Sequence, residues 1–219
     1  MKGRAADLWQ RETAARPIDE LLPILAFAEF DGIFIDRTGY EDGAASVECP
    51  ISDVLGASPI ESADGRFLFF SLTSYRETLR TRYAPSDWNA LHDRALFPVF
   101  SQWTGGLTAP ATKESGSIHW CEERATLTVT NDLNYARRVR LEMKVDAFFN
   151  PKAPLRIEGS LLSGEYLISN EPRCISWTGL VPPGIHSIDF VCPNQRGVAT
   201  PDRRSFTIRV QALTLQELE

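Results

Sequence analysis

The chain has 219 residues, of which 43% are apolar and 24% charged, and its net charge is −6. This composition predicts a folded chain that can bury a core, and the acidic balance argues against nucleic acid as a partner. The nearest basic cluster is Arg137, Arg138 and Arg140, whose alternation with apolar residues favours a solvated strand end over an anion site.

Helical and strand-like patterns alternate over residues 1–96, which predicts a small α/β subdomain. A glycine closes one expected helix, an Asp-Gly pair predicts a hairpin turn, and Pro85 breaks the last helical segment into two pieces. The expected helices cover 17–30, 43–56 and 74–96, and the expected strands cover 32–37, 58–62 and 65–72.

Short strands separated by Gly, Pro and Asn turns follow over residues 97–219. Several segments alternate apolar with polar residues, as "TLTVT" and "RVRLEMKV" do. The expected strands cover 117–122, 124–131, 137–149, 154–162, 164–169, 174–181, 186–192 and 204–216. Because two packed sheets bury that many half-apolar strands, we predict a jelly-roll-like antiparallel β-sandwich and an α+β fold class overall.

The cysteines and the N-terminus bear on metal binding and on location. No two of Cys49, Cys121, Cys174 and Cys192 form a CxxC pair, so we expect no metal on them. Reduced core cysteines are the default, and a Cys174–Cys192 bridge is the alternative. No apolar run reaches the roughly 18 residues of a membrane span, and no secretory signal is visible, which predicts a cytoplasmic protein if Met1 is the natural start.

The segment "FDGIFIDRTGYEDGA" is a candidate site, because ligands of α/β sheets lie at the carboxyl ends of strands. It places Asp36, Arg37 and Tyr40 after an apolar strand as candidate polar contacts. Its structural alternative is that Asp36 pairs with Arg37 or caps the next helix. The chain contains no GxSxG, HExxH, P-loop or GxGxxG motif, so we expect neither a cofactor nor a metal.

Aromatic residues of the expected sandwich are the other candidates, because a flat ring can stack on a sugar ring. Trp103, Trp120 and Trp177 are the candidate stacking residues, each with a core position as the alternative. Asp202 and Arg203 precede the last strand and are candidate polar contacts, with an ordinary surface pair as the alternative.

Several runs resemble the extramembrane C-terminal region of large bacterial polytopic membrane proteins of the sugar-transferase or phosphoglycerol-transferase-like kind. They are "IDELLPILAFAEFDGIFIDRTG", "YEDGAASVECPISDVLGASPIESADGRFLFFSL", "IHWCE", "VPPGIHSIDFVC" and "TPDRRSFTIRV". The sequence departs from that pattern at "ECPISDVLG" and "FPVFSQWTGG". The resemblance implies an excised domain at the periplasmic face of the inner membrane, with Met1 internal to a longer polypeptide and the transfer chemistry in its membrane-embedded part or in the first loops of that part.

The leading hypothesis is a non-catalytic extracytoplasmic accessory domain that binds a glycan or a lipid-linked sugar, with the membrane-embedded part of the same polypeptide as its other partner. The second hypothesis is a hydrolase or transferase acting on a glycosidic or phosphorylated substrate. In it, Asp36 and Asp42 are acid and base, and Arg37 binds the anion. The third is a purely structural interaction domain, which the burial of every tryptophan and the lack of a cleft would favour.

Overall fold

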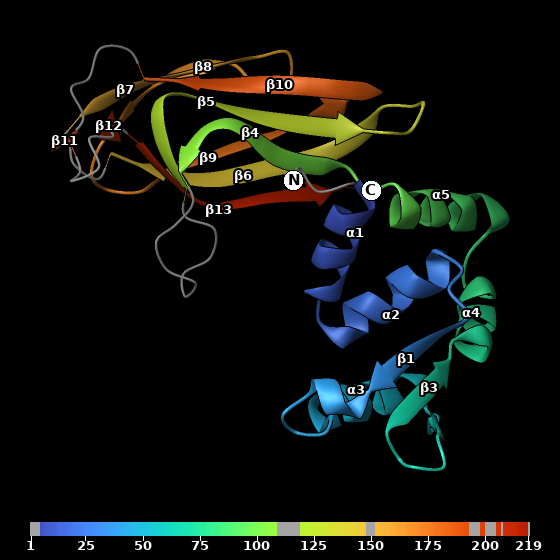
Figure 1. The fold of residues 1–219 in the computed structure, drawn as a ribbon. Coiled ribbons are helices and arrows are strands. Elements are labelled where there is room, and N and C mark those ends of the chain that lie inside the picture. Colours follow the sequence, from blue (N-terminus) through green and yellow to red (C-terminus); the bar gives the residue numbers. More distant parts are fainter. Residues whose placement is uncertain are drawn as a thin grey trace. The chain divides into compact units, whose positions relative to one another are not determined.

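The computed structural model describes residues 5–108, 119–147, 152–192, 198–199, 205–206 and 208–218. The chain divides into two compact units, Met1–Pro98, here called the helical unit, and Val99–Glu219, here called the sandwich. The first contains helices and a small sheet and the second contains antiparallel strands, which confirms the predicted fold class (Figure 1). Among the described residues, every helix is too short or too polar to cross a lipid bilayer.

Every helix and strand expected in the helical unit is present, together with an N-terminal helix that the pattern did not predict. The elements are α1 (Ala5–Ala14), α2 (Ile18–Phe27), β1 (Gly32–Asp36), the 3-10 turn η1 (Arg37–Gly39), α3 (Ala45–Leu55), β2 (Ile60–Glu61), β3 (Phe67–Ser71), α4 (Thr73–Arg80) and α5 (Pro85–Leu96). Gly56 ends α3 with a φ of +60°, a left-handed conformation that glycine adopts without steric cost.

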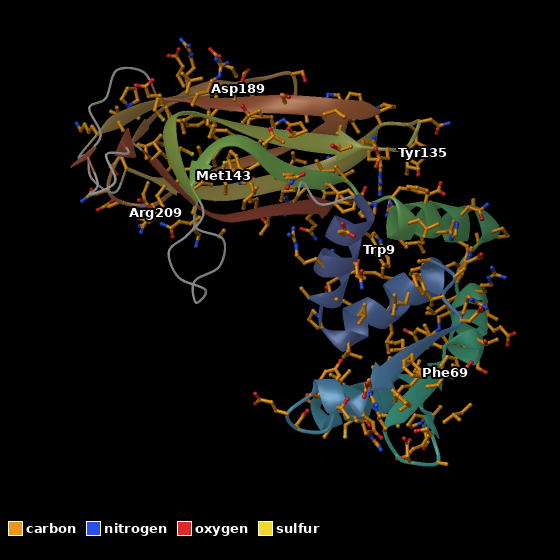
Figure 2. All side chains as sticks on the ribbon, in the orientation of Figure 1. Trp9, Phe69, Tyr135, Met143, Asp189 and Arg209 are labelled. Atoms are coloured by element: carbon orange, nitrogen blue, oxygen red, sulfur yellow. The ribbon has the colours of Figure 1, made fainter. Side chains whose placement is uncertain are left out.

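The small sheet has the antiparallel order β1-β3-β2, and its two faces differ sharply. One face contributes Ile35, Leu68 and Phe70 to a buried core with Leu22 of α2 and Ile51 of α3. The other face, here called the aromatic face, consists of Phe34, Ile60, Phe67 and Phe69; Figure 2 labels Phe69. All of these residues except the half-buried Phe67 are exposed, so the sheet has one buried and one solvent-facing apolar side.

The strands of the sandwich agree with most of the expected segments. They are β4 (Phe100–Thr108), β5 (His119–Asn131), β6 (Arg137–Asp146), β7 (Ala153–Gly159), β8 (Gly164–Ile168), β9 (Arg173–Val181), β10 (Gly184–Val191), β11 (Val198–Ala199), β12 (Ser205–Phe206) and β13 (Ile208–Glu217). The sequence did not predict β4, and two of its expected segments join to form β5. β4 pairs antiparallel with β5 and so adds a strand to the sheet beside it.

Eight strands of the sandwich form a sheet with the order β8-β7-β10-β5-β13-β6-β9, with β4 on β5, and the short strands β11 and β12 pair with each other. β8, β7 and β10 form one layer of the sandwich, and β13, β6 and β9 form the other. β5 connects the two layers, because its residues 124–131 pair with β10 and its residues 119–121 pair with β13. Inward side chains of both layers form one core, in which Met143 is labelled in Figure 2. β8 and β9 are therefore the two end strands of the order.

The predicted alternative of a Cys174–Cys192 bridge is wrong, because β9 pairs with β6 whereas β10 pairs with β5 and β7. Cys174 is exposed and Cys192 is buried, and all four cysteines are free. The expectation of core cysteines holds only for Cys121 and Cys192. Burial raises the pKa of Cys121 and raises the pKa of Cys192 to about 12.

Candidate functional site

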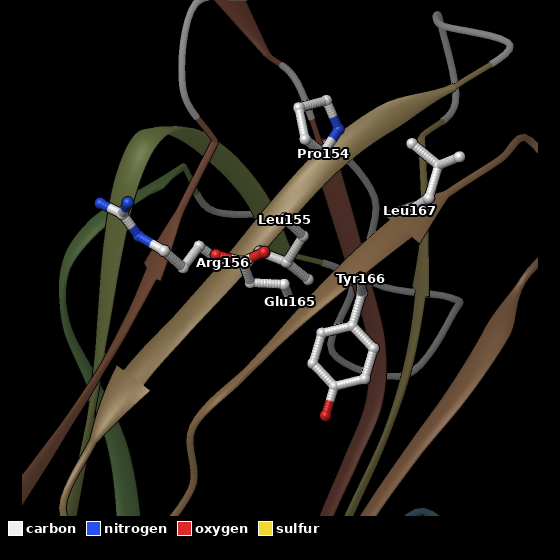
Figure 3. Close-up of a pocket in the computed structure, with 6 residues that line it drawn as sticks. All are labelled: Pro154, Leu155, Arg156, Glu165, Tyr166 and Leu167. Atoms are coloured by element: carbon white, nitrogen blue, oxygen red, sulfur yellow. The ribbon is translucent and has the colours of Figure 1, made fainter.

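An open pocket of about 420 Å³ lies over the β7–β8 pair of the sandwich (Figure 3). The register places its lining residues opposite one another on the two strands, as three cross-strand pairs. These pairs are Pro154 with Leu167, Leu155 with Tyr166, and Arg156 with Glu165. Among the described residues β8 has a strand neighbour on one side only, so the pocket lies at an open edge of the sheet.

Tyr166 supplies the aromatic surface of the pocket, and its ring lies along its own strand. A Cβ on Gly164 would stand only 3.0 Å from the Tyr166 hydroxyl oxygen, so the absence of a side chain there leaves room for the ring. The guanidinium carbon of Arg173, at the start of β9, lies 5.2 Å from the ring centroid, within cation–π range. The ring is therefore half-buried and held between its strand and a cation.

The polar groups of the pocket are exposed and carry opposite charges. Arg156 Nε lies 2.6 Å from Glu158 Oε1, an ion pair that orients the guanidinium. Among the described residues, no cation lies within salt-bridge distance of the Glu165 carboxylate, so its oxygens face solvent. The pocket thus offers a hydrogen-bond acceptor in Glu165, several hydrogen-bond donors in Arg156 and an aromatic surface in Tyr166. These are the kinds of group that bind a ring compound carrying hydroxyl groups.

The candidate tryptophans take different positions in the structure. Trp103 packs against the core, with its ring centroid 5.1 Å from that of Phe190. Trp177 is half-buried on β9, and its ring lies where a Cβ on Gly179 would stand. The side chain of Trp120 lies outside the described part of the chain, as do Asp202 and Arg203. The sequence reasoning missed Tyr166; the only signal was a tyrosine two residues after a glycine in a short expected strand.

Asp36 lies at the end of β1 in the helical unit and is bound by neighbours on the same unit. Arg66 donates to it twice, from Nε at 3.0 Å and from a terminal nitrogen at 2.6 Å. Thr38 donates from its backbone at 3.0 Å and from its hydroxyl at 2.7 Å. The hydrogen bonds from Arg66, followed by those from Thr38, hold the pKa of Asp36 well below its usual range. The carboxylate pairs with Arg66 and not with Arg37, and it caps the 3-10 turn η1 and not the helix α3.

Arg37 connects the end of β1 to its neighbours. It donates to Glu48 on α3 at 2.9 Å, to the Gly65 carbonyl at 2.8 Å, and to Glu61. Asp42 accepts hydrogen bonds from the backbone of the first turn of α3 and so caps that helix. The Tyr40 side chain is exposed, and it is the one member of the candidate trio that is not tied to a partner by a side-chain bond in the described residues.

The described residues show no group of three His, Cys, Asp or Glu side chains that could hold a metal ion. The polar groups of the two candidate sites have different arrangements. In the helical unit they are paired and hold strand and helix ends together, whereas around Tyr166 they line an open pocket.

No family model and no curated protein sequence matches this chain. Among solved structures, the chain is distantly similar to a family 35 carbohydrate-binding module from Clostridium thermocellum, with 9% identity, 55% of this chain and 97% of that chain covered, and a TM-score of 0.35. A mannan-binding module from Man5C shows 10% identity over 54% and 93% of the two chains, with a TM-score of 0.33.

The GH26-CBM35 β-(1,4)-mannanase of Podospora anserina shows 10% identity and a TM-score of 0.35 over 54% of this chain. This chain spans only 28% of that enzyme's length. At these scores the likeness carries no argument about ligand or mechanism, so function has to rest on the site itself.

Proposed function

We propose that the sandwich is a non-catalytic module that binds carbohydrate in the β7–β8 pocket. The observation that carries the proposal is the pocket of about 420 Å³ that Tyr166, Arg156 and Glu165 line at the open edge of the sheet. Arg156 and Glu165 are on the exposed side of this edge, and the Tyr166 ring is on the side that packs against the core. Its volume falls within the roughly 300–1,000 Å³ typical of small-molecule sites. A hydroxyl-rich sugar chain that bends over this edge meets all three kinds of group.

The bound sugar places its apolar face on the exposed part of the Tyr166 ring, which buries apolar area at low entropic cost. Arg156 donates to sugar oxygens, and Glu165 accepts from sugar hydroxyls; hydrogen bonds to charged groups are the stronger kind. Because β8 is an end strand, a longer chain can continue beyond the pocket along the open edge. Binding is therefore expected for oligosaccharides as well as for single rings.

The arrangement of carboxylates in the helical unit supports a non-catalytic role. The enzyme hypothesis needs Asp36 or Asp42 to carry a transferable proton. Arg66 holds Asp36 ionised, and hydrogen bonds from Ser46 and from the backbone of the first turn of α3 lower the pKa of Asp42. Arg37, the expected anion site, already binds two carboxylates. These groups serve the fold in the arrangement observed.

A binding assay on the purified chain tests the glycan proposal. A glycan array followed by calorimetric titration of the best ligand compares the wild type with Tyr166→Ala, Tyr166→Phe and Tyr40→Ala. We expect Tyr166→Ala to weaken binding by roughly fivefold or more, as for a residue at the centre of an interface. Tyr166→Phe keeps the ring and most of the affinity, and Tyr40→Ala, an exposed tyrosine in the helical unit, changes nothing.

Two outcomes would overturn this reading. A silent array with a folded protein removes carbohydrate binding altogether. Binding that is lost in Tyr40→Ala and kept in Tyr166→Ala moves the site to the helical unit.

We further propose that this module is the periplasmic accessory part of a membrane-bound, envelope-assembling transferase-like protein, which rests on the sequence resemblance. An antibody raised against the purified chain tests it on fractionated cells of the source organism. The expected result is a band larger than the 219-residue chain in the inner membrane, digested by protease from the periplasmic side. A band of the chain's own size in the cytoplasm would refute it.

A further inference from the structure

The solvent side of β6 carries a row of cations, here called the β6 row, formed by Arg138, Arg140 and Lys144. Each is exposed, and they alternate with core residues of the same strand. With a strand rise of about 3.3 Å per residue, the α-carbons of Arg138 and Arg140 are about 7 Å apart and those of Arg140 and Lys144 about 13 Å. The strand thus holds three positive charges in line on one face.

The cations of the β6 row differ from their arginine neighbours in having no partner carboxylate among the described residues. Arg137, expected from the sequence to be solvated, is instead buried in an ion pair with Glu217. Arg209 pairs with the buried Asp146 at 2.9 Å. No described carboxylate lies within salt-bridge distance of the row, although the chain as a whole has a net charge of −6. Its charges remain available to an anion from outside.

Neutral polar side chains flank the row on both neighbouring strands. Arg140 lies opposite Thr178 of β9 and Gln216 of β13. Glu142, the one carboxylate inside the row, lies opposite Ser176 and accepts a hydrogen bond from its hydroxyl at 3.4 Å. Hydroxyl and amide groups beside separated cations suit a polymer that carries both hydroxyl groups and anionic groups.

We propose that the β6 row binds a linear polysaccharide bearing carboxylates, which lies along the strand. The side chains described on this face include no aromatic ring on which nucleobases could stack, which disfavours single-stranded nucleic acid. The large apolar side chain exposed on this face of β9 is Leu180, too little apolar surface to hold a lipid bilayer. The row is separate from the Tyr166 pocket, so this inference extends the proposed function without depending on it.

A charge-matched comparison tests the β6 row. The probe is polygalacturonate, with neutral dextran, polyphosphate and phosphatidylglycerol vesicles as the other arms. The test variant combines Arg138→Gln, Arg140→Gln and Lys144→Gln. The control variant changes three exposed arginines of the helical unit and has the same net charge; it combines Arg16→Gln, Arg80→Gln and Arg82→Gln.

We expect the test variant to bind polygalacturonate about tenfold more weakly, the cumulative effect of three exposed charge pairs, and the control variant to bind as the wild type does. Added salt should lower the affinity of the wild type for polygalacturonate toward that of the test variant. The test variant should still bind the best neutral ligand of the glycan array as the wild type does, because none of its three changed residues lines the Tyr166 pocket; this separates a failure of this proposal from a failure of the pocket. Equal binding of polygalacturonate by the test and control variants, a loss of dextran binding in the test variant, or tighter binding of polyphosphate or vesicles by the wild type overturns the proposal.

A thiol footprint locates the polymer independently of mutation. Cys174 is exposed and lies directly opposite Lys144, whereas Cys49 is exposed in the helical unit. A polymer along β6 should slow the modification of Cys174 by N-ethylmaleimide severalfold and leave the rate at Cys49 unchanged. Equal rates at Cys174 with and without saturating polygalacturonate would place the polymer elsewhere and overturn the assignment.

Discussion

Truncating two phenylalanines of the small sheet tests which of its faces is buried. Phe70 is 1% exposed and packs in the core of the helical unit, whereas Phe34 on the neighbouring strand is 65% exposed. Removing a buried phenylalanine ring costs about 3–5 kcal/mol of unfolding free energy. Phe34 keeps about a third of its surface buried, and full burial of such a side chain stabilises by roughly 1.5–3 kcal/mol. Phe34→Ala should therefore cost only about 0.5–1 kcal/mol.

Hydrogen exchange with mass spectrometry on the full chain measures both variants, because peptides from β1 and β3 report on the helical unit alone. Domains of this size have about 5–15 kcal/mol of unfolding free energy, so Phe70→Ala removes a large part of it. Amides of β3 should then exchange about 100-fold faster or more in Phe70→Ala and only about fivefold faster in Phe34→Ala. Similar exchange in the two variants would show that the aromatic face is covered, and would refute the reasoning.

Three further predictions concern thiols, acid stability and backbone space. Cys49 and Cys174 should react with maleimide in the folded protein, while the two buried thiols react only in denaturant. Mass spectrometry shows which peptides are labelled. Labelling of a buried thiol in the folded protein would contradict its position in the core. Arg66 lowers the pKa of Asp36, so the ion pair contributes its full stability to the fold at pH values above about 3.9, the ordinary pKa of an aspartate. This contribution is lost as the pH falls from there toward the lowered pKa of the folded state. Asp36→Asn should therefore remove this part of the loss of stability in acid, which unfolding followed by circular dichroism at a series of pH values measures. A pH profile of stability equal to that of the wild type would argue against the pair. Gly179→Ala pushes a methyl group into a tryptophan ring and should cost about 1–3 kcal/mol in urea unfolding, whereas an unshifted midpoint would mean that the ring moves freely.

Elements that depend on neighbouring residues could be predicted from the sequence. Gly56 ends α3, the Asp-Gly turn joins β2 to β3, and Pro85 begins α5, each by a conformational preference of that residue. β4 was missed because its glycines break the alternation: the pairing with β5 shifts register around Gly105, and Gly106 has a φ of +71°. A bulged strand has no clean period of two.

The contacts of the candidate sites depend on strand register, which the local pattern does not contain. Asp36 pairs with Arg66, thirty residues away, because β1 and β3 lie side by side. Tyr166 is half-buried at a pocket because β8 is the last strand of its layer, a property of the strand order and not of the segment itself. The residues of the "FDGIFIDRTGYEDGA" stretch could be found by reading, but their partners could not.

Strand position also separates what the two proposed surfaces can bind. Within the described parts of the chain β8 has a strand neighbour on one side only, and the pocket lies at that edge, whereas β6 lies between β13 and β9 and presents a flat row of cations. Short neutral oligosaccharides should therefore depend on Tyr166, and affinity for carboxylated polymers should rise with chain length until the chain spans the roughly 20 Å from Arg138 to Lys144. Titrating a polygalacturonate length series measures this. Affinity that is independent of length would mean that a single cation, and not the row, makes the contact.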